Sequence, residues 1–288
     1  MLNRFVFMFA GAVLGAVLLT IVASATTAPV TLVRTRRFAR RQELLVTSSN
    51  GPLVVRALAV THRWRVLGLT TGLVLGVLWA LRDARLTISF SAGFLGWFVG
   101  AVVAEWRLAG LPVEGGRRTA SLTRRTVRGY LRMDSTVLLA LACLALAGLV
   151  VAVVVRSHGD GAVMAQAAAW LLVAALGLGA LWATLLRVVS RPQPGSSAEL
   201  VAADDALRAR SANVLAGSAI VAAGYPAASL LTLMADPAST DSVSAWGAAS
   251  LTCLVATVVV GWLVAVRRSP VRTRPAADVV ATSPGVAP

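Results

Sequence analysis

The sequence contains no lysine and few acidic residues: only 12 of its 288 residues are Asp or Glu. Its positive charge comes from 27 arginines, which give a formal net charge of +15. Charged residues make up 14% of the chain, whereas an ordinary soluble domain has about 25%. Because 57% of the residues are hydrophobic, there is too little polar surface to cover a water-soluble globule. The composition therefore predicts a multi-pass protein of the cell membrane.

Residues suited to catalysis are also scarce. The two cysteines, Cys143 and Cys253, lie in the middle of apolar runs without a second ligand at a metal-binding spacing. His62 lies in a basic stretch, and His158 lies in "RSHGDGA", which is typical of a solvated turn rather than of a metal site. No phosphate-binding glycine loop, HExxH motif or GxSxG motif is found. We expect no enzymatic activity, no catalytic residues, no cofactor and no metal.

Long apolar runs are what the chain has in abundance. Each is long enough, or nearly so, to cross a bilayer as a helix that satisfies its own backbone hydrogen bonds. The second run is the shortest, and a buried or re-entrant segment is its alternative. The fold class predicted is an all-α bundle of about seven transmembrane helices, at residues 5–25, 66–81, 86–104, 135–155, 162–186, 212–235 and 243–266.

The arginines alternate between the two sides of this predicted bundle. Segments 34–65, 107–132, 187–210 and 267–288 carry eight, seven, four and four arginines, together 23 of the 27. Short arginine-rich loops are retained in the cytoplasm. The N-terminus is therefore predicted to lie outside and the C-terminus in the cytoplasm, with all seven helices obeying one orientation.

The opening run has a second interpretation. Residues 5–22 resemble the apolar region of a secretory signal, and "ASA" at residues 23–25 is a small-x-small cleavage site. Cleavage there would leave the following arginine cluster outside unless the topology of all later helices changed. We therefore expect an uncleaved first helix.

A layout follows from the spans and the loops. The hairpins begin alike, with Arg65, Arg132 and Arg210 directly before the ascending helix, which is typical either of an internal repeat or of any basic helix end. A helix is expected to start near Ser197. The predicted segments are a first helix (1–33), a basic cytoplasmic segment (34–65), hairpins at 66–104, 135–187 and 212–266, cytoplasmic loops at 105–134 and 188–211, and a disordered cytoplasmic tail (267–288).

The cytoplasmic arginines are the candidate contact residues. "RTRRFARR" places five arginines at 34–41, and Phe38, Leu44 and Leu45 give this segment an apolar side, which predicts a helix lying at the membrane interface. Such clusters either only fix topology or also attract anionic lipid, and a protein partner is a further alternative. The candidate residues for lipid or partner contact are Arg36, Arg37, Arg40, Arg41, Arg117, Arg118, Arg124 and Arg125.

Two features inside the spans concern helix packing. Small residues recur four apart at Gly11 and Gly15, at Gly68, Gly72 and Gly76, and at Gly96 and Gly100, which predicts close helix contacts within the bundle. Pro226 lies inside the sixth span beside Tyr225, so a kink is expected there. Such a kink serves packing or lines a cavity near Tyr225.

Two stretches carry a resemblance to other proteins. At "GGRRTASLTRRTVRGYLRMD" and "VAADDALRARSANVLAGSAIVAAG" the chain resembles a loose group of uncharacterised multi-pass membrane proteins of high-GC actinobacteria. The resemblance covers about half of the chain and implies a membrane location. It implies no activity and no catalytic residues.

Two functions from different classes fit these observations. The first is a non-enzymatic accessory or scaffolding protein, whose basic loops contact membrane lipids or a membrane or cytoplasmic protein partner. The second is a small transporter or permease-like subunit with a cavity near the kink in the sixth span. The absence of charged residues from the span interiors favours the first, because ion pathways depend on such groups. Nucleic acid is not expected as a partner, since no recognisable nucleic-acid-binding pattern accompanies the charge.

Overall fold

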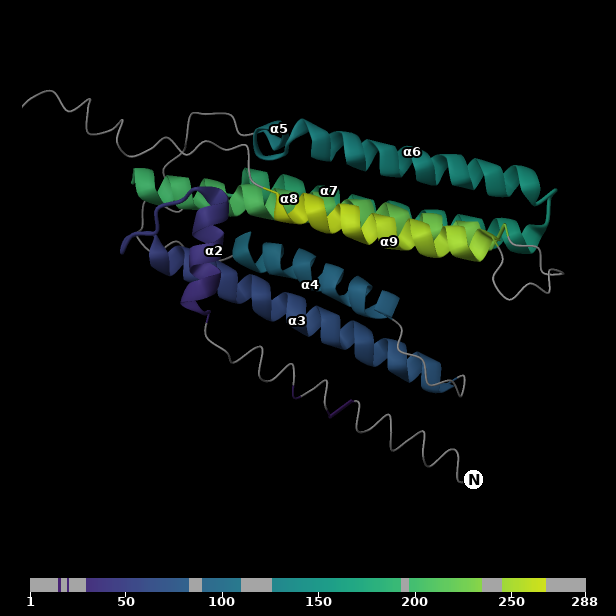
Figure 1. Ribbon diagram of the computed structural model, residues 1–288, viewed down its shortest axis with the longest axis horizontal. Helices are drawn as coiled ribbons and strands as arrows, with labels where there is room; N and C mark the ends of the chain where they lie inside the picture. The colour runs from purple at the N-terminus through teal and green to yellow at the C-terminus, as the bar shows by residue number, and fades with distance from the viewer. Residues whose placement is uncertain are drawn as a thin grey trace, which may run out of the picture. The chain divides into compact units, whose positions relative to one another are not determined.

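The computed structural model describes residues 15–16, 20, 30–82, 90–109, 126–192, 197–234 and 245–267. All regular secondary structure within these residues is helical, which confirms the all-α part of the predicted fold class (Figure 1). Contacts divide the chain into two compact units. Unit 1 comprises Met1–Ala120, Arg191–Leu207 and Thr273–Pro288, and unit 2 comprises Ser121–Ser190 and Arg208–Arg272.

Unit 1 is built around a hairpin of two long helices, α3 (Gly51–Arg82) and α4 (Phe90–Ala109). The glycines that the sequence places four apart allow these helices to touch. A Cβ atom added to Gly68 would overlap the carbonyl oxygen of Gly96 and lie 2.8 Å from the Cα of Gly100. Gly72 meets the carbonyl of Ala92 in the same way. The predicted glycine contact within the bundle is therefore confirmed for this pair of helices.

A short helix, α2 (Leu32–Gln42), packs against one end of α3. It runs across the direction of α3 rather than along it (Figure 1). Phe38 of α2 is buried in a core cluster with the early turns of α3 and of α8 (Ala198–Thr232). The buried members of this cluster are Phe38, Leu44, Val54, Ala57, Leu58, Ala203, Ala206 and Leu207.

Unit 2 is a bundle formed by the rest of α8 and by three long helices that run alongside it (Figure 1). These are α6 (Met133–Arg156), α7 (Gly161–Ser190) and α9 (Ala245–Val266), preceded by the single turn α5 (Val127–Tyr130). Leu146 and Val153 of α6 pack in one cluster with Ala223 and Leu230 of α8. Between α6 and α7, the predicted solvated turn contains His158 and Gly159 in the left-handed region.

The surface of unit 2 has the polarity expected for contact with lipid. Most of α8 is buried, whereas α6, α7 and α9 leave large apolar side chains exposed. Buried polar residues such as Asn213 and Ser218 lie on α8 instead. The most exposed examples on the outer helices include Leu144, Val151, Val155, Leu172, Leu176, Leu251, Val255 and Trp262. Apolar side chains outside and polar ones inside are the arrangement that a bilayer, rather than water, accommodates.

Four helices of the described part are long and apolar enough to cross a membrane: α6, α7, α8 and α9. They correspond to the last four of the seven expected spans and indicate a membrane protein. The second and third expected spans fall within α3 and α4. The first expected span lies outside the described residues, except for Gly15, Ala16 and Thr20. The total of seven spans and their orientation stay predictions.

Two helices begin well before the apolar runs that marked them. Helix α3 starts at Gly51, although the apolar run starts at Val66, and α8 starts at Ala198, although its run starts at Ala212. Ser197 caps α8, since its Oγ accepts a hydrogen bond from the Leu200 amide at 3.3 Å, as expected from the sequence. Hydrophobicity marks only the part of a helix that suits lipid, whereas helical backbone hydrogen bonding extends beyond the apolar run. The expected loop segments 34–65 and 188–211 are thus partly helical.

Candidate functional site: basic surfaces at the helix ends

Helix α2 presents a positively charged face. Thr35, Phe38 and Gln42 recur on one side and are buried. The arginines occupy the other positions and are all exposed: Arg34, Arg36, Arg37, Arg40 and Arg41. The buried side fixes the helix to unit 1, so the five arginines are presented from an anchored helix; this surface is called the α2 basic face.

The apolar side of α2 differs from the expectation. Phe38 and Leu44 were expected to face lipid, but they are buried in the protein core with α3 and α8. Leu45 is 75% exposed, and so is Leu32 at the other end of the helix. Sequence periodicity identifies an apolar side but not what covers it. Apolar contacts with a bilayer would come from the exposed residues at the two ends of α2.

The segment after α2 is held by specific hydrogen bonds. The Asn50 side chain is buried, accepts a bond from the Thr47 amide at 2.9 Å and donates to the Leu45 carbonyl at 2.9 Å. Thr47 Oγ1 donates to the Glu199 carboxylate at 2.6 Å, and Ser49 Oγ donates to it as well. These bonds from Ser49 and Thr47 hold the pKa of Glu199 below its usual range. The α2 basic face is therefore tied to α8 by Glu199, one of the few acidic residues of the chain.

The positive charge on this side of unit 1 comes from arginine. Burial, followed by the charges of Arg34 and Arg65, lowers the pKa of His62. His62 is therefore neutral at pH 7, and its charge adds nothing to the basic face. The positive charge is consequently constant across the physiological pH range.

Two arginines lie against tryptophan rings between α3 and α4. The guanidinium of Arg107 lies 5.3 Å from the ring centroid of Trp64, and that of Arg65 lies 5.3 Å from the centroid of Trp97. Both distances suit a cation–π interaction. Gly100 faces the backbone of Trp64, so Trp97 lies one turn nearer the middle of the hairpin. Arg65 therefore reaches along α4 toward Trp97.

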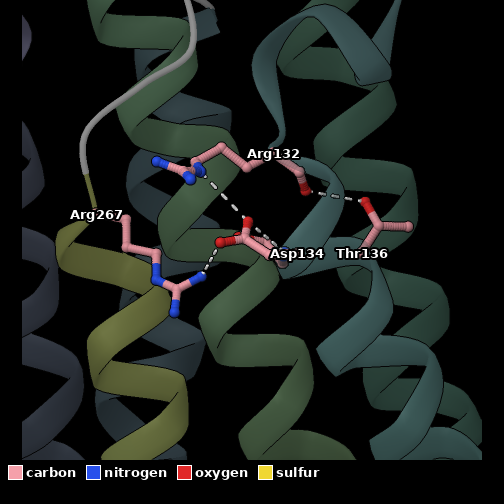
Figure 2. Close-up of polar contacts among 5 residues, drawn as sticks. Arg132, Asp134, Thr136 and Arg267 are labelled. Atoms are coloured by element: carbon pink, nitrogen blue, oxygen red, sulfur yellow. Dashed lines mark hydrogen bonds and ion pairs between the residues drawn. The ribbon is translucent and has the colours of Figure 1, made fainter.

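In unit 2, a polar cluster lies where α6 begins and α9 ends (Figure 2). The Asp134 carboxylate pairs with Arg267 and lies 3.4 Å from the Arg132 Nε. It also accepts a hydrogen bond from the Ser135 amide at 2.8 Å, in the first turn of α6. A carboxylate is stabilised at a helix N-terminus by the helix dipole. Two guanidinium groups thus converge on one carboxylate.

Arg208 is buried in α8 with no exposed surface. Its Nη1 donates hydrogen bonds to the carbonyl oxygens of Val188 at 3.0 Å and Val189 at 2.9 Å. These carbonyls belong to the last turn of α7, where a helix has no further amides to offer them. Arg208 therefore caps α7. One turn earlier, Asp204 forms a buried ion pair with Arg191 at 2.7 Å.

The other expected site residues have different outcomes. Tyr225 and Pro226 lie within α8, which remains helical through the proline. The Tyr225 ring meets Trp170 of α7 edge-on, with centroids 5.6 Å apart. A cavity beside Tyr225 stays a prediction. The expected contact residues Arg117, Arg118, Arg124 and Arg125 lie outside the described residues.

Sequence reasoning missed the cluster around Asp134 and the cap formed by Arg208. A single acidic residue at the start of the fourth span was the available signal for Asp134. Its pairing with Arg267, 133 positions away, requires the fold. No three His, Cys, Asp or Glu side chains gather in the described ranges as a metal site would require. Comparisons with protein families, curated proteins and solved structures found no match to this chain.

Proposed function

We propose that this chain is a non-enzymatic membrane protein, an accessory or scaffolding subunit whose cytoplasmic arginine surfaces bind the anionic lipid of its own membrane. The observation that carries the proposal is the α2 basic face, in which five exposed arginines sit on a helix fixed by its buried side. A helix that only needed to mark topology would not have to be anchored in this way.

Electrostatics and geometry support lipid as the ligand. Each basic side chain near an anionic membrane surface contributes about 1 kcal/mol of attraction. Helix α2 crosses the direction of the α3–α4 hairpin, so it would lie in the membrane plane when the hairpin spans the bilayer (Figure 1). The exposed side chains of Leu32 and Leu45 would then enter the interface beside the arginines.

The lipid contact can be measured with a fluorescent probe. In a background with Cys143→Ala and Cys253→Ala, Leu45→Cys carries an environment-sensitive fluorophore on the full chain in nanodiscs. We expect a blue shift when phosphatidylglycerol replaces phosphatidylcholine. Replacing Arg36, Arg37, Arg40 and Arg41 by Gln should abolish the shift. Equal spectra in the two lipids would contradict the proposal.

A matched charge-preserving variant separates lipid attraction from docking of a protein. Lysine keeps the charge but lacks the planar, bidentate geometry of arginine. Replacing the same four arginines by Lys should preserve the lipid-dependent shift. If both the Gln and the Lys variants instead lost a stoichiometric protein during gentle purification from native membranes, a protein partner would replace lipid as the ligand.

A further inference from the structure

Among the described residues, unit 2 contains buried polar side chains without a hydrogen-bond partner: Ser218, and the two that matter here, Asn213 and Ser135. Asn213 of α8 is 1% exposed, and neither its Nδ2 nor its Oδ1 is bonded. Ser135 of α6 is 0% exposed, and its Oγ is likewise unbonded. A buried amide without partners is costly, and such groups call for a ligand, an ion or a water molecule.

Helix register places these two side chains at one level. Leu138 and Ala142 of α6 pack in a cluster with Ala216 and Ile220 of α8, and the two pairs are each offset by 78 residues. Ser135 and Asn213 have the same offset and lie one turn before those residues on the same helix faces. Each therefore continues the α6–α8 contact by one turn toward the cytoplasmic end.

The third helix of this contact brings the polar cluster to the same level. Val264 of α9 belongs to the cluster of Ala216 and Ile220, and Arg267 follows it by three residues. Gly217 of α8 faces Ala265 of α9, so the turn with Asn213 lies opposite the end of α9. Arg267 pairs there with Asp134, beside Arg132 (Figure 2).

Charge decides which ligand suits this place. Arg132, Asp134 and Arg267 together carry one excess positive charge and are 51%, 43% and 33% exposed, so a ligand can reach them. A cation would meet a carboxylate that two guanidinium groups already neutralise. An oxyanion would gain two arginines, with amide and hydroxyl donors of Asn213 and Ser135 beneath them.

The depth of these arginines in the membrane indicates whether the oxyanion belongs to a lipid headgroup. Trp262 of α9 and Trp182 of α7 are exposed on the apolar exterior. Each precedes an arginine, Arg267 or Arg187, by five residues, or about 7.5 Å of helix. Tryptophan is enriched at the headgroup level of membranes. Arg267 and Arg187 are therefore expected at the depth of the lipid phosphates.

We propose that Arg132 and Arg267, with Asn213 and Ser135, form a binding site for the phosphate group of an anionic phospholipid. Asp134 occupies the two guanidinium groups when the lipid is absent and competes with it. The inference rests on the membrane location proposed above, but not on the α2 basic face.

Substitutions with opposite expected effects on lipid affinity test this site. Delipidated full-length protein is titrated with dioleoyl phosphatidylglycerol and observed by native mass spectrometry. Arg132→Gln and Arg267→Gln should each weaken the first bound lipid about tenfold. Asp134→Asn should strengthen it several-fold, because the competing carboxylate is gone. A purely structural Asp134–Arg267 pair would give no gain in affinity for Asp134→Asn, and that result would overturn the site.

A second variant covers the case in which the ion-pair variants fail to fold. Asn213→Leu removes the unbonded amide and should leave the unfolding midpoint of the lipid-free protein equal or higher, while lipid binding weakens. Unchanged binding would exclude Asn213 from the site. Arg156→Gln, at the far end of α6, is the matched charge control and should bind as the wild type does.

Three ligands and one further variant identify the source of the phosphate. Dioleoylglycerol, which lacks phosphate, should not bind. Binding of inorganic phosphate without binding of phosphatidylglycerol would overturn the lipid assignment. The protein with Arg36, Arg37, Arg40 and Arg41 replaced by Gln should keep its tightly bound lipid. If that four-arginine variant lost the tightly bound lipid while Arg267→Gln kept it, the lipid would bind at α2. That result would reject the site at Arg132 and Arg267 and would leave the proposal for the α2 basic face intact.

Discussion

Arg208 shows how a charge is kept inside an apolar helix. Its side chain has no exposed surface, yet Nη1 meets two carbonyls at the end of α7. Those carbonyls carry the negative end of the helix dipole. A sequence shows neighbours along one helix, but not that the end of another helix approaches the same arginine.

Replacing Arg208 by Met should destabilise the protein strongly. The change leaves two buried carbonyls without donors, a loss of about 2–4 kcal/mol. The midpoint of thermal unfolding in detergent measures the effect. Arg128→Gln, at an exposed arginine, is the control and should change stability by less than about 0.5 kcal/mol. Equal midpoints for the two variants would mean that Arg208 does not cap α7.

Glu199 should titrate at a lower pH than an ordinary glutamate. Hydrogen bonds from Ser49 and Thr47 favour the carboxylate, so the folded pKa lies below the unfolded value of about 4.3. This contribution to stability is therefore present above pH about 4.3 and is lost as the pH falls through the folded pKa. Carboxyl ¹³C NMR of the wild type and of the Thr47→Val, Ser49→Ala variant measures the pKa. The same value in both would contradict the role of the two hydroxyls.

At the scale of helices, the sequence predicted contact partners better than boundaries. Glycines spaced four apart predicted a close contact, and α3 and α4 approach each other at Gly68, Gly72, Gly96 and Gly100. The start of α3 was placed too late, because charged residues do not end a helix, whereas the start of α8 near Ser197 was predicted correctly. Phe38 was assigned to the correct side of α2, but its contact with α3 and α8 depends on segments far along the chain.

Gly96→Ala should separate α3 from α4. The added Cβ would overlap the Gly68 carbonyl and lie 2.8 Å from the Cα of Gly72, and a backbone cannot move aside cheaply. We expect a loss of about 1–3 kcal/mol, seen as a lower unfolding midpoint. Gly148→Ala on α6 is the matched control, since its Cβ would meet nothing within 4 Å. There the better helix propensity of alanine should leave stability equal or raised by up to about 1 kcal/mol. Equal responses at both sites would exclude close packing as the cause.

For the whole molecule, the amino-acid composition alone predicted that the helices face lipid rather than water. A chain with 57% hydrophobic residues was expected to be helical and to face lipid, and α6, α7 and α9 do leave large apolar side chains exposed. The candidate sites were less accessible to such reasoning. Arg36, Arg37, Arg40 and Arg41 stand out in the sequence as a charge run. Asp134, Asn213 and Arg267 do not, because only helix packing places them at one level.

Both proposed lipid sites require the arginine-rich helix ends to lie in the cytoplasm. Single cysteines at Asn3, Ser48 and His158, in a background with Cys143 and Cys253 replaced by Ala, can be labelled with a membrane-impermeant maleimide. Intact cells should label positions 3 and 158, while position 48 should react only after the membrane is permeabilised. Labelling of position 48 on intact cells would contradict the account, because it would place the α2 basic face outside.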